Sequence, residues 1–169
     1  MGQPPEPEFA QFYDATWART LACTYAMTGD IGVAEELAQE AYTRAWSRWS
    51  QISRYDEPGA WVRQVATRLA VSRLRRSRAA KAWQHHTRHV SQVAPPDETS
   101  ALLVAALRQL PEAQRRAIVL HHLADLPVDE VARLEKCPSG TVKARLSRGR
   151  AALGEILADT RPNGAPTHA

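Results

Sequence analysis

The sequence predicts an all-α protein built from two small helical domains joined by a flexible linker. Apolar residues recur with the period of an amphipathic helix over nearly the whole chain, and the alternation typical of strands is missing. The periodicity is lost at one internal stretch that contains Pro95-Pro96. We therefore expect domains at residues 8–77 and 101–158, a linker at 78–100 and a disordered tail at 159–169.

Three helices are expected in the first domain. An aromatic-rich amphipathic pattern covers residues 8–27 and stops at Gly29, a residue type that favours helix ends. A second helix is expected at about 31–49, followed by a short aromatic loop at 50–56 and a helix that begins at Pro58. In this third helix, the residues expected to point away from the core stripe are Gln64, Thr67, Arg68, Val71 and Arg75.

The second domain is expected to hold two amphipathic helices, at 101–110 and 112–123, packed under a helix-turn-helix. Residues 126–153 have the pattern of that motif: a short apolar helix with acidic residues at its start, a tight turn, and an acid-free basic helix. Ser139 follows Pro138 at the expected N-cap of the second helix.

The basic helix has two faces that the sequence predicts. Val142, Leu146, Gly149 and Leu153 fall at helical spacing and form one buried stripe. The opposite side combines small residues, which permit close backbone approach, with basic residues that reach phosphates or base edges. We expect this side to bind DNA, and it carries Gly140, Lys143, Ala144, Arg145, Ser147 and Arg148.

Positive charge is concentrated in two zones. Residues 61–96 contain eight basic residues and no acidic one, and residues 139–169 contain five basic and two acidic residues. Residues 1–60, by contrast, contain nine acidic and four basic residues. Two basic zones predict two contacts with a polyanion. The first zone lies near Tyr55 and Trp61, aromatic residues suited to stacking on the bases of a single strand.

Composition argues against several other classes. No apolar run is long enough for a membrane span, and the N-terminus lacks the basic and apolar segments of a signal peptide. Cys23 and Cys137 form no CxxC motif, which fits a reducing cytoplasm. The histidine cluster at residues 85–89 lacks the cysteine or carboxylate partners of a metal site. We expect no cofactor, no metal and no enzymatic activity, and we interpret His121-His122 as a helix-surface pair.

Two segments resemble a known family. Residues 34–46, AEELAQEAYTRAW, resemble the sigma-factor region that binds the clamp helices of RNA polymerase, and residues 107–153 resemble the sigma-factor domain that reads the promoter −35 element. With a basic helix between them, the chain resembles the small extracytoplasmic-function (ECF) sigma factors over about residues 9–157. The sequence YAMTGD before the AEEL run resembles the actinobacterial-type subgroup.

The resemblance implies a role in transcription initiation without bond chemistry. The chain would recruit core RNA polymerase, bind promoter duplex at −35 and hold the melted −10 strand, with an anti-sigma factor as a candidate third partner. The implied polymerase contacts are Glu36, Gln39, Glu40 and Arg44. The expected −10 contacts are Tyr55, Trp61, Arg68, Ser72, Arg75 and Arg76. The expected −35 contacts are Ser139, Thr141, Lys143, Ala144, Arg145, Ser147 and Arg148.

Two −10 positions depart from the family pattern, because many relatives carry Asn and Asp where this chain has Arg68 and Ser72. A free-standing helix-turn-helix regulator of the response-regulator type is the main alternative, but it would need a receiver domain with alternating strands, which residues 1–100 do not indicate. An RNA-binding adaptor acting through residues 61–89 would need aromatic-rich strands. We also expect the two helical halves to be independent, with proteolysis starting in the linker.

Overall fold

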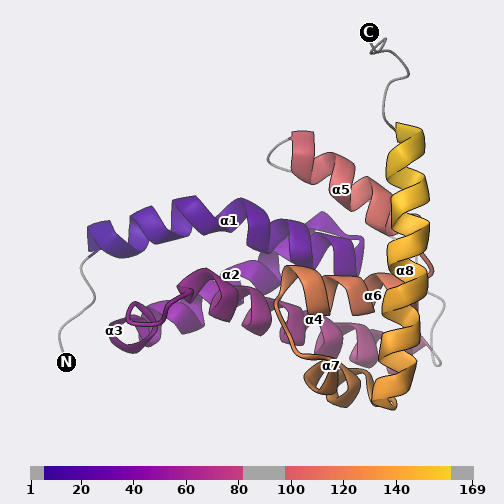
Figure 1. The fold of residues 1–169 in the computed structure, drawn as a ribbon. Helices are drawn as coiled ribbons and strands as arrows, with labels where there is room; N and C mark the ends of the chain where they lie inside the picture. The colour runs from indigo at the N-terminus through magenta and orange to yellow at the C-terminus, as the bar shows by residue number, and fades with distance from the viewer. Residues whose placement is uncertain (1–5, 82–97, 161–169) are drawn as a thin grey trace, which may run out of the picture.

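The computed structural model describes residues 6–81 and 98–160, and every regular element in these two ranges is helical. This confirms the predicted all-α class. The helices are α1 (Glu6–Thr28), α2 (Ile31–Ser47), α3 (Trp49–Ile52), α4 (Pro58–Lys81), α5 (Glu98–Arg108), α6 (Glu112–Ile118), a π-helical turn (Val119–Leu123), α7 (Val128–Glu135) and α8 (Ser139–Thr160) (Figure 1).

The first half is a bundle in which α1, α2 and α4 pack on one another. An aromatic cluster closes one end of this bundle, where the ring of Phe9 meets that of Trp49 edge-on at 5.1 Å between centroids. At the other end, Gly29 has a φ of +70° and ends α1, as predicted. Asp30 then caps α2, because its Oδ1 accepts a hydrogen bond of 3.1 Å from the Val33 amide.

The second half packs α5, α6 and α7 against α8. Val142, Leu146 and Gly149 are buried and Leu153 is half-buried, which confirms the predicted stripe. A Cβ atom added at Gly149 would lie 3.0 Å from Cγ1 of Ile118. The close approach of α8 to α6 therefore favours a glycine at this position, since a side chain would have to displace Ile118 by a few tenths of an ångström.

Three local boundaries differ from the prediction. The predicted second helix is interrupted at Arg48, and a short helix, α3, occupies residues expected to be loop. The predicted helix at 112–123 changes after Ile118 to a π-helical turn, closed by a bond from the Ala124 amide to the Val119 carbonyl. Ser139 is the first residue of α8 and not its N-cap, because the Thr141 and Val142 amides already bond to the Pro138 carbonyl.

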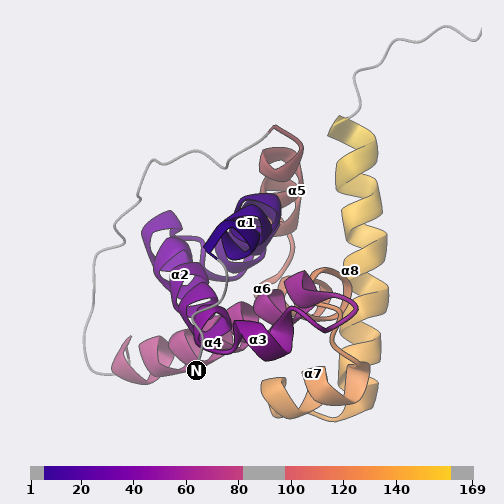
Figure 2. The same ribbon diagram turned by 90° about the vertical axis from the view of Figure 1, so that its left-hand side faces the viewer.

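The two halves are in contact, whereas the sequence led us to expect independent halves. α1 packs against α5, and α4 contacts α7 and the π-helical turn (Figure 2). One apolar core joins residues of both halves, among them Cys23, Met27 and Val71 from the first and Leu107 and Leu120 from the second. Burial in this core raises the pKa of the Cys23 thiol to about 12. The predicted linker falls largely at residues 82–97, outside the described ranges.

This packing overturns the predicted exposure of Thr67 and Val71. Both are buried, at 0% and 6% exposure. The hydroxyl of Thr67 bonds to the Arg63 carbonyl of its own helix at 2.8 Å, and Val71 lines a small hollow together with Leu134 of α7. The apolar pattern of α4 predicted one buried side of the helix. The structure buries a second side as well, on which Val71 lies beside Leu134 of the second half.

In the two described ranges, none of the helices combines the length and the apolar character that a bilayer crossing requires.

We predict that Gly149→Val destabilises the protein by about 1–3 kcal/mol, because the new side chain must displace Ile118 in a packed core. Gly154→Val is the matched control in the same helix, since a Cβ there meets nothing within 4 Å. The control should change the free energy of unfolding by about 0.5 kcal/mol or less. Urea denaturation of both variants measures the difference, and equal effects would show that α8 does not pack on α6 as described.

Candidate nucleic-acid interface

The outer face of α8 is open to solvent. Gly140, Lys143, Ser147 and Arg148 are exposed, and Ala144 is partly exposed between them. Nothing lies within 4 Å of the position of a Cβ at Gly140, so the start of this face is unobstructed. In Figure 1 α8 forms one edge of the molecule. The structure therefore places these predicted −35 residues on one surface of a single helix, which is the geometry that the major groove accepts. Ser139 and Thr141, at the start of α8, are partly exposed.

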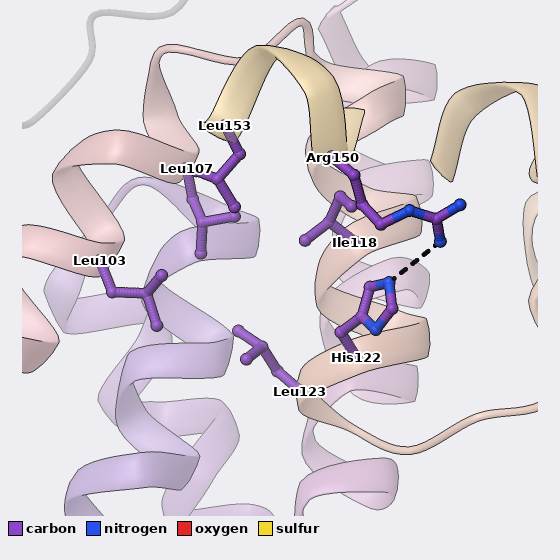
Figure 3. A pocket seen from close by; sticks show the side chains of 7 residues that line it. All are labelled: Leu103, Leu107, Ile118, His122, Leu123, Arg150 and Leu153. Atoms are coloured by element: carbon purple, nitrogen blue, oxygen red, sulfur yellow. Dashed lines mark hydrogen bonds between the residues drawn. The ribbon is translucent and has the colours of Figure 1, made fainter. Parts of the chain in front are cut away.

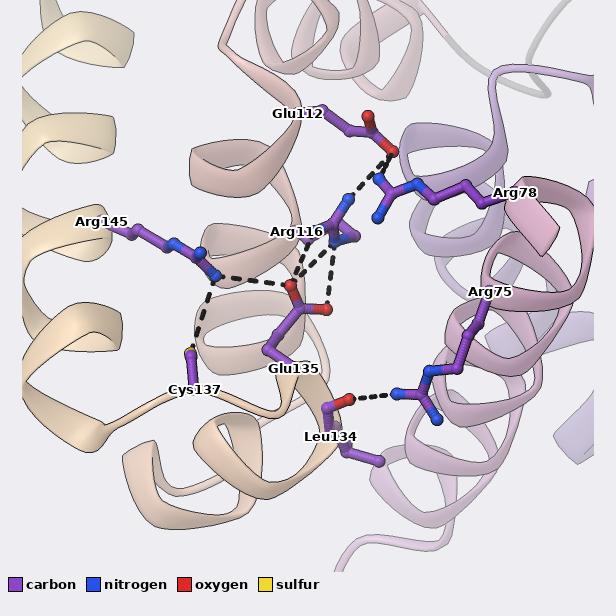
Figure 4. Close-up of polar contacts among 8 residues, drawn as sticks. All are labelled: Arg75, Arg78, Glu112, Arg116, Leu134, Glu135, Cys137 and Arg145. Atoms are coloured by element: carbon purple, nitrogen blue, oxygen red, sulfur yellow. Dashed lines mark hydrogen bonds and ion pairs between the residues drawn. The ribbon is translucent and has the colours of Figure 1, made fainter. Parts of the chain in front are cut away.

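A buried ion pair fixes the turn that precedes α8. Arg116 of α6 makes a bidentate contact with Glu135 at the end of α7, with Nε–Oε1 at 3.0 Å and Nη2–Oε2 at 2.8 Å (Figure 4). The Glu135 side chain is only 4% exposed. Burial alone would lower the pKa of the Arg116 guanidinium, but hydrogen bonds to Glu135 and the charges of Glu135 and Glu112 outweigh it and raise that pKa.

The same network includes one predicted DNA contact. Arg145 of α8 lies 3.6 Å from Oε2 of Glu135 and 3.7 Å from Sγ of Cys137, both through Nη1 (Figure 4). Its side chain is 24% exposed, so part of the guanidinium faces the interior of the motif. Arg145 therefore helps to hold the turn, while Lys143 and Arg148 on either side of it are exposed.

Some of the predicted −10 residues of α4 bond α7, and others bond no described residue. Arg68 Nη2 lies 3.2 Å from Oε1 of Glu130, and Arg75 Nη2 donates to the Leu134 carbonyl at 2.6 Å. Both acceptors belong to α7. Arg75 is nevertheless exposed, as are Ser72 and Arg76, and the last two make no ion pair or side-chain hydrogen bond with any residue that the structure describes. The predicted −10 residues of α4 therefore differ in their partners: Arg68 and Arg75 bond α7, whereas Ser72 and Arg76 do not.

Arg63 is a feature of α4 that the sequence analysis did not single out. It is 5% exposed, and its Nε donates to the Leu123 carbonyl at 2.9 Å while Nη2 lies 3.0 Å from Oδ2 of Asp125. Its partners are about sixty residues away in sequence. A local sequence pattern cannot connect residues that far apart. The only sequence signal for burial of Arg63 was its position next to Val62, a residue of the apolar stripe.

The two predicted aromatic contacts have different surroundings. Tyr55 is 40% exposed in the loop after α3. Trp61 is half-buried and packs against the aromatic cluster of the first half. Tyr55 therefore offers a free ring face to a base more readily than Trp61, whose ring also contributes to the core.

One face of α2 is exposed and carries two acidic residues. Its exposed residues include Glu36, Gln39, Glu40 and Arg44. Arg44 Nε lies 2.8 Å from Oε1 of Glu40, and Glu36 lies 3.9 Å from Arg73 of α4. Exposed pairs of this kind contribute little to stability. Their charges are therefore available to a protein partner.

An apolar hollow of about 250 Å³ lies between α5, α6, the π-helical turn and α8 (Figure 3). His122 and Arg150 stand at its edge, with Nη1 of Arg150 3.5 Å from Nε2 of His122. Burial and the neighbouring His121 and Arg150 lower the pKa of His122, which favours the neutral ring. His121 Nδ1 lies 2.8 Å from the Leu126 carbonyl and helps to fix the segment that leads into α7. The residues that line the hollow are Leu103, Leu107, Ile118, His122, Leu123, Arg150 and Leu153.

Comparison with known families matches each half of the chain to a different sigma-70 region. Residues 14–80 match the family described as sigma-70 region 2, and residues 100–153 match the family described as sigma-70, region 4. The chain is 29% identical to the ECF RNA polymerase sigma factor SigW of Bacillus subtilis over 89% of each chain. It is 30% identical to the probable ECF RNA polymerase sigma factor SigI of Mycobacterium tuberculosis over 82% of this chain, and spans 52% of that protein.

A solved structure has a similar fold. The sigma factor RpoE from Bartonella quintana, in complex with the anti-sigma factor NepR, superposes with a TM-score of 0.58 and 24% identity, covering 91% of this chain and 99% of that one. The likeness shows that the fold of the two chains is shared.

We predict that Glu135→Gln destabilises the protein by about 3 kcal/mol, because it removes the buried carboxylate from Arg116 and leaves only the partly exposed Glu112 as its acidic partner. The matched control is Glu130→Gln, which removes the same charge from the same helix. The arginine partners of Glu130 are Arg68 and Arg133, whose side chains are 41% and 77% exposed. The control change should cost about 1 kcal/mol or less. Urea titration compares the two variants, and equal stabilities would contradict the structural role of the Arg116–Glu135 pair.

Proposed function

We propose that this chain, which belongs to the ECF branch of the sigma-70 family, uses α2, α8 and α4 to contact core polymerase, −35 duplex and melted −10 strand, respectively. As a sigma factor it directs transcription initiation from specific promoters. The observation that carries the residue assignments is the geometry of α8: its apolar stripe is buried and its small and basic residues are exposed on the opposite side.

The proposed −35 contact uses the outer face of α8. The small residues Gly140, Ala144 and Ser147 let the helix approach the floor of the major groove, and Arg148 is positioned to form a bidentate contact with a guanine edge. Lys143 and the partly exposed Arg145 reach the flanking phosphates. The amides of Ser139 and Gly140 and the hydroxyl of Thr141 lie at the helix start, where a phosphate is favoured.

The proposed −10 contact combines stacking and charge. Tyr55 and Trp61 supply rings for unstacked bases, Arg75 and Arg76 supply charge to the strand's phosphates, and Arg68 and Ser72 lie between these groups along α4. Because many relatives have Asn and Asp in place of Arg68 and Ser72, we propose that this chain prefers a different −10 sequence.

The proposed polymerase contact is the exposed face of α2, made of Glu36, Gln39, Glu40 and Arg44. Binding and strand separation require no bond chemistry, so we assign no enzymatic activity. A protein with these partners acts in the cytoplasm, and an anti-sigma factor is a candidate regulator. The mycobacterial relatives SigI and SigK, at 30% and 29% identity, support the actinobacterial-type subgroup.

We predict that Glu40→Lys weakens binding to core RNA polymerase at least tenfold, because it reverses a charge in the centre of the proposed contact, where like charges facing each other cost about 1.4 kcal/mol or more. The free energy of unfolding should change by about 0.5 kcal/mol or less, since Glu40 is exposed. The control is Glu8→Lys, an exposed position on α1. Binding of labelled core enzyme to each variant is the measurement. Parent-like affinity of Glu40→Lys would mean that this face does not contact polymerase.

We predict that Arg148→Ala relaxes sequence preference at one or two −35 positions, where a bidentate arginine discriminates between bases by about 1–3 kcal/mol. Arg133→Ala removes another exposed arginine of the helix-turn-helix and should leave the ranking of sequences unchanged. Holoenzyme binding to a library of −35 variants separates the two effects. Uniform weakening across the library by Arg148→Ala would reassign this residue to a phosphate contact.

A further inference from the structure

The hollow between α5, α6, the π-helical turn and α8 has an apolar interior and a polar edge. Leu107 and Ile118, which are 1% and 4% exposed, form its floor and belong to the core that both halves share. The half-buried side chains of Leu103, Leu123 and Leu153 form its walls. Figure 3 shows these five side chains around one space, with Arg150 and His122 together at one side of it. This division into an apolar interior and a polar edge is typical of a site for an amphipathic molecule.

The polar edge carries a positive charge. Arg150 is exposed and makes no ion pair with any acidic residue that the structure describes, and none of the residues that line the hollow is acidic. Its Nη1 lies 3.5 Å from Nε2 of His122. Because burial, His121 and Arg150 lower the pKa of His122, this ring is neutral at pH 7 and can offer one N–H donor. The edge is therefore complementary to a carboxylate, which a guanidinium binds through two parallel N–H groups.

The volume of the hollow limits the apolar part of a ligand. An aliphatic cavity of about 150 Å³ holds benzene, so a hollow of about 250 Å³ has room for about ten carbon atoms. The apolar lining consists of four leucines and one isoleucine, without an aromatic side chain on which a flat ligand could stack. A flexible acyl chain fits such an irregular aliphatic space.

We propose that this hollow is a binding site for a medium-chain fatty acid, with the acyl chain between α5 and α8 and the carboxylate on Arg150 and His122. The site is separate from the residues assigned to polymerase and promoter, since none of those residues lines it. A bound chain contacts α5, α6 and α8 at once. It therefore stabilises the second half, and the melting temperature rises with the concentration of the fatty acid.

The first experiment locates the ligand on the parent chain. Decanoate is the probe and 1-decanol is its uncharged counterpart, each titrated below its aggregation limit into full-length chain with ¹³C-labelled Leu and Ile methyl groups. We expect saturable shifts at the methyl groups that line the hollow. Leu21 and Ile31, which pack in a separate cluster of the first half, are the internal control and should not shift.

The apolar part of the site is tested by Leu103→Trp, with Leu102→Trp as the matched control. Leu102 is the neighbouring residue on α5, is 50% exposed and does not line the hollow. The indole at position 103 fills the space, so decanoate should bind about tenfold more weakly or worse, because burial of the acyl chain supplies most of the affinity. The control should bind decanoate as the parent does.

The charged part of the site is tested by Arg150→Gln, with Arg133→Gln as the matched control. Arg133 is an arginine of 77% exposure that does not line the hollow. Arg150→Gln should weaken decanoate binding about two- to fivefold, the range that an exposed ion pair contributes, and should leave 1-decanol binding unchanged. Equal losses for decanoate and 1-decanol would overturn the assignment of the carboxylate to Arg150.

Other outcomes assign the hollow differently and overturn the proposal. Shifts at Leu21 and Ile31 as large as those in the hollow would mean a general detergent effect. If decanoate gives no saturable shift, but the same methyl groups respond to the concentration of the chain alone or to core RNA polymerase, the occupant is a second copy or a protein partner. If circular dichroism shows that Leu103→Trp does not fold, Leu123→Phe replaces it, and the parent titration stands without either variant.

Discussion

The position of α4 between two packed surfaces is the constraint on which the rest of the structure depends. Val62, Ala66 and Ala70 of this helix are buried in the first half, and the neighbouring side, with Arg63 and Val71, is covered by the second half. The exposed surface of α4 lies mainly in its C-terminal half. There Ser72 and Arg76 are exposed, whereas the exposed Arg75 also bonds the Leu134 carbonyl of α7.

Arginines in this chain have different roles because their surroundings differ. Arg116 is held by a buried carboxylate and keeps the helix-turn-helix rigid, so that the exposed face of α8 is presented in one orientation. Arg63 is buried and joins the two halves. Arg148 is exposed on the opposite side of α8 from the buried stripe. Rigid presentation matters for recognition, because a base contact requires accurate placement of the guanidinium plane.

Helical periodicity was sufficient to predict the faces of helices that pack on one neighbour. The stripe of α8 and the glycine that ends α1 were predicted for this reason, since each depends on residues close in sequence. Val71 was predicted wrongly because α7, distant in sequence, lies beside it, and Thr67, one turn earlier on the same helix, is also buried. The π-helical turn after Ile118 was also missed, because a single extra residue per turn leaves the apolar pattern nearly unchanged.

The candidate site was predictable as a set of basic and aromatic residues but not as an arrangement. Arg68, Arg75 and Arg76 have similar local sequence, yet the first two bond α7 and Arg76 bonds no residue that the structure describes. The polymerase-binding role of the α2 face was predicted from the resemblance to the family. The residue spacing alone predicts only a solvent-exposed acidic surface. Long-range pairs such as Arg63 with Asp125 are set by tertiary packing, which no local pattern encodes.

The central claim is that this chain gives core RNA polymerase a promoter preference. Run-off transcription with purified core enzyme on a library of genomic fragments, with and without the chain, tests it most directly. The account predicts discrete start sites that appear only when the chain is present and that share upstream sequence at the −35 and −10 positions. Core enzyme that binds the chain but initiates at the same sites with and without it would contradict the account.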